Sequence, residues 1–150
     1  MTDEEYMKLA ITEAQKARAE GEIPIGAVLV WRGIVLAADH NRREEEKDPT
    51  AHAEILVIRK AGARISNWRL TNTVLYVTIE PCAMCAGAIM NARIGRLVYG
   101  SADERAGGVR SAWHITDGST MNHRIEVTSG ICEKECRALM DEFFATRRTN

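Results

Sequence analysis

The sequence contains few aromatic residues and no excess of charge of either sign. Phenylalanine, tryptophan and tyrosine make up 5% of its 150 residues, so aliphatic side chains must fill most of the core. Lysine and arginine number 20 against 21 aspartate and glutamate residues, which gives a formal net charge of −1. Domains that bind nucleic acid through a broad basic surface are usually strongly basic. Charge alone therefore ranks a small molecule above nucleic acid as the ligand.

Long hydrophobic runs and a secretory signal are also missing. The longest apolar stretch, Ile23–Trp31, is interrupted by Pro24 and Gly26 and is too short to cross a bilayer. The first five residues are largely acidic, unlike the basic start of a secretory signal. At 45% hydrophobic and 27% charged residues, the chain has the composition of a globular protein. We therefore expect a single domain over residues 1–150, in the cytoplasm and with no membrane partner.

The four cysteines are better suited to metal or catalytic chemistry than to disulfides. A domain of this size without an export signal does not depend on disulfide cross-links. Cys132 and Cys136 lie four residues apart in an expected helix, and we interpret both as structural. Near the end of the same helix, we expect Phe143 to point inward and Phe144 outward.

The hydrophobic pattern predicts an alternation of strands and helices. Helices are expected at Asp3–Glu20, His52–Ala61, Ala83–Ala92 and Ile131–Arg147, and strands at Pro24–Trp31, Ile34–Asp39, Thr73–Ile79, Arg96–Gly100 and Ile125–Thr128. Residues 42–48 carry mixed charge and are expected to form a solvated loop. Thr50 is a candidate cap for the second helix, which Gly62 should end. A hairpin followed by strand–helix–strand crossovers predicts a mixed sheet with helices on both faces.

The sharpest motif is the Pro-Cys-Ala-Met-Cys segment at residues 81–85. It follows an expected buried strand and opens a helix, so Cys82 and Cys85 lie about one helical turn apart. Two thiolates at this spacing can bind one ion, and soft sulfur ligands favour zinc. Taken alone, the motif could equally be half of a structural zinc site, a redox pair or two buried cysteines.

The second motif is His52-Ala53-Glu54, at the start of an expected helix. His52 can supply a nitrogen ligand to a metal ion. Glu54 lies two residues further on, and the two side chains can face one cleft only in the first helical turn. Taken alone, the pair also suits a surface histidine beside a first-turn glutamate that the helix dipole favours.

Together, the two motifs supply one histidine and two cysteine ligands. A catalytic zinc ion typically has three protein ligands and an open fourth position, whereas a structural zinc ion has four. His-x-Glu followed by Pro-Cys-x-x-Cys is a signature of zinc-dependent base deaminases, in which the glutamate acts as general acid and base. The combination is far more specific than either motif alone.

The chain resembles the bacterial tRNA-specific adenosine deaminases over nearly its whole length. The segments that carry the resemblance are 26–28, 40–42, 48–54, 67–70, 73–88, 93–96, 121–124 and 143–144. The zinc motif alone would fit the wider cytidine deaminase superfamily, and the flanking segments narrow the resemblance to this branch. Residues 106–115 depart from the small-residue pattern that is usual in this loop of the family.

The resemblance implies a fold, an activity and a set of site residues. The implied fold is a three-layer α/β/α cytidine deaminase-like fold with a five-stranded mixed sheet, in a homodimer with one zinc ion per subunit. The implied activity is hydrolytic deamination of adenosine to inosine at the wobble position of a tRNA anticodon stem-loop. The implied zinc ligands are His52, Cys82 and Cys85, and the implied proton shuttle is Glu54. The implied substrate contacts are Asn41, Ala53, Asp103, His123, Phe144, Arg147 and Arg148.

Other functions remain open at the level of sequence. The chain could deaminate a free nucleobase or nucleoside of the guanine or cytosine type, or adenine in single-stranded DNA. A non-enzymatic zinc module would need a fourth protein ligand, for which His40 or Cys132 would have to serve. If RNA is the substrate, the near-neutral charge indicates that local contacts, rather than a general basic surface, hold it.

Overall fold

The computed structural model describes residues 1–117 and 122–148, without the side chain of Arg148. Met121, which belongs to one of the segments that carry the resemblance, lies outside the described residues. The helices are α1 (Asp3–Ala19), α2 (Arg43–Glu46), α3 (Ala53–Ile65), α4 (Ala83–Asn91) and α5 (Glu133–Arg148), with a short 3-10 helix at Ile115–Asp117. The strands are β1 (Gly26–Trp31), β2 (Ile34–His40), β3 (Thr73–Ile79), β4 (Arg96–Ser101) and β5 (Glu126–Ser129).

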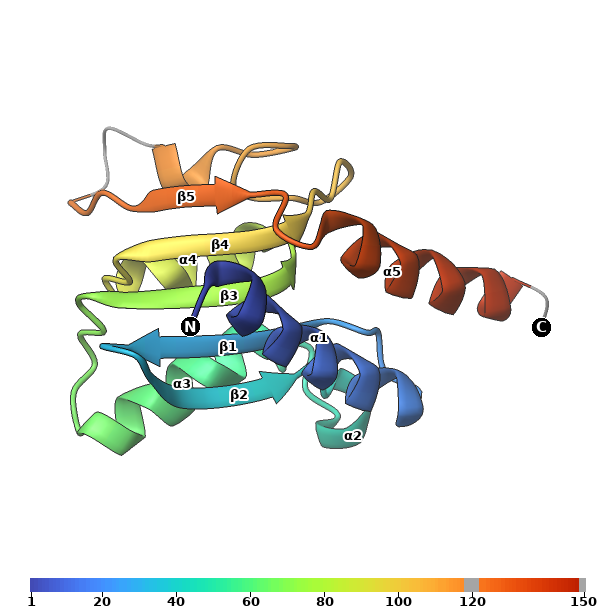
Figure 1. The fold of residues 1–150 in the computed structure, drawn as a ribbon, viewed down its shortest axis with the longest axis horizontal. Helices are drawn as coiled ribbons and strands as arrows, with labels where there is room; N and C mark the ends of the chain where they lie inside the picture. The colour runs from blue at the N-terminus through green and yellow to red at the C-terminus, as the bar shows by residue number, and fades with distance from the viewer. Residues whose placement is uncertain (118–121, 149–150) are drawn as a thin grey trace.

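The five strands form one mixed sheet in the order β2-β1-β3-β4-β5 (Figure 1). Strand β1 runs antiparallel to both of its neighbours, whereas β3, β4 and β5 pair in parallel. Strands β2, β3, β4 and β5 therefore all end at the same edge, which we call the carboxyl edge. In open sheets of this kind, ligands bind beyond the carboxyl ends of the strands.

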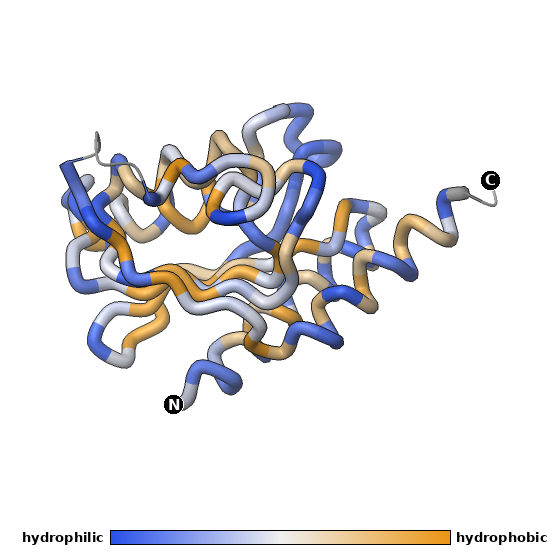
Figure 2. Tube along the Cα trace, turned by 90° about the horizontal axis from the view of Figure 1, so that it is seen from above, coloured by the Kyte–Doolittle hydropathy of each residue, from blue (hydrophilic) through white to orange (hydrophobic). Residues whose placement is uncertain are grey.

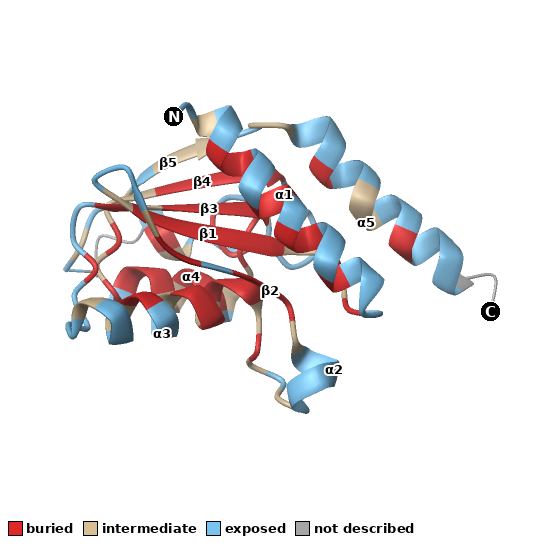
Figure 3. Ribbon diagram, turned by 60° about the horizontal axis from the view of Figure 1, so that its bottom comes forward, coloured by how far each residue is buried: buried red, intermediate tan, exposed pale blue. Residues whose placement is uncertain are grey.

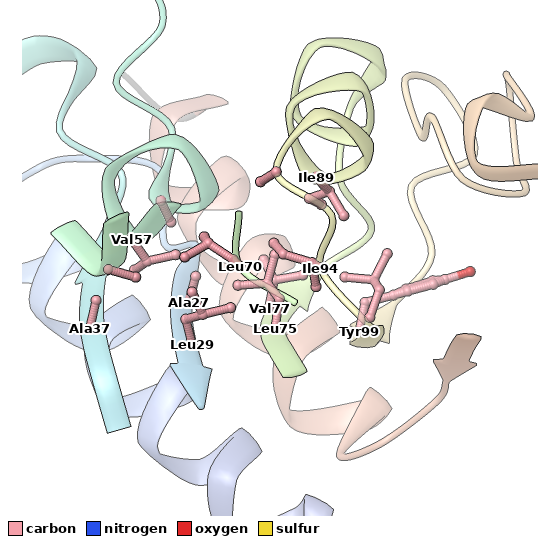
Figure 4. Packing of buried hydrophobic residues seen from close by; sticks show 14 of the residues in the cluster. Ala27, Leu29, Ala37, Val57, Leu70, Leu75, Val77, Ile89, Ile94 and Tyr99 are labelled. Carbon is pink, nitrogen blue, oxygen red and sulfur yellow. The ribbon is translucent and has the colours of Figure 1, made fainter. Parts of the chain in front are cut away.

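Helices cover both faces of the sheet, as the sequence predicts (Figures 2 and 3). Helices α3 and α4 pack on one face, where Val57, Leu75 and Ile89 belong to one buried cluster (Figure 4). Helices α1 and α5 pack on the other face, where the second cluster includes Met7 and Cys136. The result is the predicted three-layer α/β/α arrangement.

Local sequence explains how α1 begins. The Thr2 hydroxyl accepts a hydrogen bond from the Glu5 amide, and the Glu5 carboxylate accepts one from the Thr2 amide. This reciprocal pair satisfies two of the amides that every helix N-terminus leaves without an intrahelical partner. From there, buried residues recur along the length of α1, where Figure 3 marks them in red.

Three local predictions are wrong. Residues 43–46 form the short helix α2 rather than a loop, because the Glu22 carboxylate accepts hydrogen bonds from the amides of Glu44 and Glu45. Thr50 does not cap α3: its hydroxyl donates to Asp48, and His52 occupies the N-cap position. Gly62 lies inside α3, which continues to Ile65.

The close approach of α5 to the sheet depends on one glycine. A Cβ atom added to Gly100 would lie 2.5 Å from the Cys136 sulfur and 2.7 Å from the Thr78 carbonyl oxygen. Cys136 is fully buried at this contact, and Cys132 is half-buried before the start of α5. These positions agree with a structural interpretation of both cysteines. Among the described helices, we find none with the length and apolar character to cross a bilayer.

Candidate active site

The predicted metal ligands come together just beyond the carboxyl edge of the sheet. His52 is the N-cap of α3, Cys82 is the N-cap of α4, and Cys85 lies one turn into α4. The His52 Nδ1 atom is 3.6 Å from the Cys82 sulfur and 3.5 Å from the Cys85 sulfur. Two motifs 30 residues apart in the sequence therefore form one cluster.

The spacing of these atoms fits a tetrahedral zinc site. With Zn–N distances near 2.0 Å and Zn–S distances near 2.3 Å, tetrahedral geometry separates the nitrogen and sulfur atoms by about 3.5 Å. The three ligand atoms lie within 4.8 Å of one another. The donor set and its geometry thus suit zinc held by three protein ligands.

The side chains that a structural zinc site would need as a fourth ligand lie elsewhere. The two ring nitrogens of His40 face the carboxylates of Glu13 and Glu20, at 2.9 and 2.8 Å. Cys132 packs in the cluster on the α1 and α5 face, with the sheet between it and α3 and α4. Within residues 1–117 and 122–148, the His/Cys group has three members. This count favours a catalytic site over a structural one.

Glu54 lies in the first turn of α3, beside the predicted ligands. Its side chain is 4% exposed and is hydrogen-bonded to Cys85. Burial raises the pKa of Glu54 to about 7, although the nearby His52 opposes the shift. A carboxyl group with this pKa can both take up and release a proton near neutral pH.

The two cysteines have opposite pKa shifts. The hydrogen bond from Cys85, together with one from His52, lowers the pKa of Cys82 to about 4. The same contact between the sulfurs raises the pKa of Cys85, and burial adds to this shift. The start of α4 also favours a thiolate at Cys82. The hydrogen bonds and the helix start thus favour the thiolate at Cys82 over Cys85.

The family model of the MafB19-like deaminases matches residues 1–148. The chain belongs to this deaminase family. A tRNA-specific adenosine deaminase from Haemophilus influenzae is 49% identical to it over 97% of this chain and 85% of that protein. The protein of the same name from Bacillus subtilis is 46% identical over 97% of this chain and 91% of that protein.

Solved structures confirm the fold of the deaminase. One from a study of A-to-I editing by tRNA:A34 deaminases is 47% identical, with a TM-score of 0.88 over 90% of this chain and 98% of that chain. The guanine deaminase from Nitrosomonas europaea is 25% identical, with a TM-score of 0.83 over 95% of this chain and 84% of that chain. The cytidine deaminase-like fold is therefore confirmed.

Three of the predicted substrate contacts line one pocket of the deaminase. Asn41, directly after β2, is 4% exposed and shares this pocket with Phe144 and Arg147 of α5. Phe144 is 39% exposed, whereas Phe143 is buried, as predicted from the sequence. The Arg147 guanidinium lies 4.5 Å from the centre of the Phe143 ring and donates a hydrogen bond to the Gly21 carbonyl.

The other predicted contacts are more scattered. Ala53 is buried as the first residue of α3, between His52 and Glu54. Asp103 follows β4 at the carboxyl edge, and its carboxylate accepts hydrogen bonds from the amides of residues 105 and 106. His123 donates to the Ile94 carbonyl, at the opposite edge of the sheet. Arg148 is the last residue of α5, and its side chain lies outside the described residues.

A buried network at the end of β2 precedes Asn41 and was not foreseen. The Asp39 carboxylate, 2% exposed, accepts hydrogen bonds from the Lys60 ammonium at 2.6 Å and from Arg42 and the His40 amide, both at 2.7 Å. The hydrogen bonds of Asp39 to Lys60 and of His40 to Glu13 together join β2 to both α3 and α1. Glu13, Asp39 and His40 lie close enough together to hold a cation, but protein cations already pair with both carboxylates: Arg42 and Lys60 with Asp39, and Lys16 with Glu13. The sequence does not reveal the whole network, because the contacts that join it to α1 and α3, from Glu13 and Lys60, are more than 20 residues away.

Replacing Asp39 by asparagine should destabilise the protein by about 2 kcal/mol at pH 7, because hydrogen bonds to a buried charge are lost. Burial alone would raise the pKa of Asp39, but hydrogen bonds from Lys60, the His40 amide and Arg42 outweigh it and lower the pKa. Because the pKa of Asp39 in the folded protein lies below the ordinary value of 3.8, its ionised carboxylate stabilises the folded state above pH 3.8. This stabilisation is lost as the pH falls through the lowered pKa. Urea unfolding between pH 7 and pH 3 should therefore show a smaller acid-induced loss for Asp39→Asn than for the parent. Equal losses would contradict this role.

Proposed function

We propose that this deaminase converts adenosine to inosine at the wobble position of a tRNA anticodon stem-loop, with one zinc ion held by His52, Cys82 and Cys85. The observation that carries the proposal is a buried glutamate against a three-member His/Cys group. The relatives named tRNA-specific adenosine deaminase support adenosine in tRNA as the substrate. The solved structure from the study of tRNA:A34 deaminases supports the wobble position.

Glu54 carries the proton transfers of the proposed reaction. When bound, zinc would supply an acidified water molecule as the nucleophile. Glu54 takes a proton from this water and delivers it to N1 of adenine, which makes C6 electrophilic. The water oxygen then forms a bond to C6. Glu54 moves the remaining proton of this oxygen to the amino group, the C6–N bond breaks, ammonia leaves, and the oxygen stays on C6 as the carbonyl of inosine. The raised pKa of Glu54 and its place beside Cys85 suit both steps.

In this proposal Asn41 contacts the target nucleoside, and the pocket that it lines with Phe144 and Arg147 takes part of the adjoining RNA. Asn41 offers an amide for hydrogen bonds to the nucleoside, and the exposed ring of Phe144 offers a stacking surface. Arg147 and Arg148 supply positive charge for phosphates at the end of α5, while Ala53 and Asp103 border the path to the metal. His123 is not included, because it lies at the opposite edge of the sheet. The homodimer and the cytoplasmic location stay predictions.

The test of this function is a substrate panel for the zinc-loaded protein. We expect inosine in an RNA anticodon stem-loop with adenosine at the wobble position, and no product from free guanine, cytosine or adenosine. A deoxy oligonucleotide of the same sequence should react far more slowly, because RNA recognition can use the 2′-hydroxyl groups. Inosine is read by mass spectrometry of the digested nucleic acid, and ammonia release is measured for the free bases.

The similarity to guanine deaminase structures makes free guanine the most informative alternative substrate. A guanine deaminase from Bacillus subtilis is 39% identical over 68% of this chain and 66% of that chain, with a TM-score of 0.66. Faster ammonia release from guanine than from the stem-loop would replace the proposed function with this one. Equal rates on the RNA and deoxy substrates would instead extend the function to single-stranded DNA.

A further inference from the structure

Glu80 is a buried carboxylate that the proposed reaction does not use. It follows β3 directly and is 3% exposed, and Pro81 separates it from Cys82. Its hydrogen-bond partners are backbone amides and one hydroxyl group, rather than a cation. A buried charge of this kind needs several donors to offset its lost hydration.

Five hydrogen bonds join Glu80 to the loop between residues 103 and 111. Its Oε1 atom accepts from the Asp103 amide at 3.1 Å and from the Ser111 hydroxyl at 2.5 Å. Its Oε2 atom accepts from the amides of Val109, Arg110 and Ser111, at 3.1, 2.9 and 3.1 Å. One carboxylate thus holds both ends of the loop.

The same loop lies directly on the turn that carries Cys82. The Gly108 amide donates to the Pro81 carbonyl at 2.7 Å, and Gly107 pairs with Cys82 in an isolated β-bridge. A Cβ atom added to Gly108 would come within 2.7 Å of the Ala83 nitrogen. The loop therefore forms a wall beside the metal site, and any movement of the loop changes that wall.

We propose that Glu80 is a positioning residue that holds the 103–111 loop against the Cys82 turn and thereby sets the preference for the nucleotides next to the target. The inference rests on the proposed function for the identity of the substrate. Glu80 acts through the loop and does not touch the substrate. A glutamine at this position would turn an NH₂ group towards the donors of either Oε1 or Oε2, so it could not hold both ends of the loop.

The test compares Glu80→Gln with Glu104→Gln, which removes an exposed carboxylate from the same loop. Two stem-loops that differ only in the nucleotide 5′ to the target are deaminated by each protein. For Glu80→Gln, we expect KM to rise about 10-fold with kcat nearly unchanged. The loop loses hydrogen bonds and must be ordered again when the substrate binds, whereas the groups that carry out the reaction stay in place. The ratio of kcat/KM between the two stem-loops should approach one. Glu104→Gln should match the parent in both measurements.

Two further measurements separate positioning from general damage. Zinc content should stay at one ion per chain, and faster hydrogen exchange should be confined to the amides that donate to Glu80, those of residue 103 and residues 109–111. Ser111→Ala, which removes the hydroxyl bond alone, should shift KM and context preference in the same direction by a smaller factor. It also provides the test if Glu80→Gln does not fold.

The outcomes distinguish this inference from the proposed function. Unchanged KM and unchanged context preference in Glu80→Gln, with the amides of residues 109–111 released, would overturn the positioning role. Loss of zinc or of kcat in both Glu80→Gln and Ser111→Ala, without a change in context preference, would also overturn it. If the unaltered zinc-loaded protein deaminates neither stem-loop, the proposed function fails, and the inference about specificity falls with it.

Discussion

Replacing Glu54 by glutamine should lower kcat for deamination by at least about 1,000-fold while the fold and the bound zinc are kept. The amide fills the space of the carboxyl group but can neither take a proton from water nor pass one to adenine. Glu54 is 4% exposed, and burial raises its pKa to about 7, so the parent side chain exchanges protons near neutral pH. Single-turnover kinetics on the stem-loop, together with zinc analysis of both proteins, measure this effect.

Glu46→Gln is the matched control for this prediction. Glu46 is exposed in α2, so its replacement removes the same charge away from the site. Its kcat should stay within about twofold of the parent, as is usual for surface substitutions. A folded, zinc-loaded Glu54→Gln protein that turns over at the rate of this control would exclude Glu54 as the proton shuttle.

Replacing His52 by alanine should weaken zinc binding by at least about 100-fold and abolish activity with it. The His52 Nδ1 atom is the nitrogen that faces both sulfurs, so two thiolates would remain without a third protein ligand. Zinc at about 1,000 times its dissociation constant stabilises the folded state by about 4 kcal/mol. The parent should therefore unfold at a higher temperature with zinc than with a chelator, and at the same zinc concentration His52→Ala should show no more than about a third of this stabilisation.

Cys132→Ser is the control that separates the two kinds of zinc site. Cys132 lies on the face of the sheet covered by α1 and α5, away from the predicted zinc ligands. This variant should therefore keep one zinc ion per chain and parent-like activity. Loss of zinc from Cys132→Ser would restore the hypothesis of a structural site with four ligands. An unchanged dissociation constant for zinc in His52→Ala would contradict the ligand set itself.

The sequence predicts the regular elements well, because their signals are local. The alternating and helical patterns place all five strands and four of the helices, with boundaries that differ by a few residues. Helix α2 was missed because its amides bind the carboxylate of Glu22, about 20 residues away. The extension of α3 past Gly62 was missed for a different reason: the helix ends where Ser66 adopts a left-handed conformation, at a φ of 53°, and glycine rather than serine is the usual signal for such an end.

The same contrast between local and distant signals applies to the candidate site. His52, Cys82 and Cys85 are predictable because they stand in short motifs whose residue types fit one metal ion. Glu80 stands next to one of these motifs, yet its role depends on amides some 20 to 30 residues further along the chain. A charged residue at the end of a buried strand was the available signal, since such a charge must find partners in the folded protein.

The way in which Glu80 holds its loop has a consequence for how the enzyme can evolve. Four of its five bonds come from backbone amides, which every residue type except proline provides. Side chains at exposed positions such as Glu104, Arg105 and Ala106 can therefore be exchanged without loosening the anchorage. The close-packed Gly107 and Gly108 are the exceptions, because a side chain at either would collide with Glu80 or with the Cys82 turn. Natural divergence and directed evolution can thus change the exposed side chains of this loop while its backbone stays anchored to Glu80.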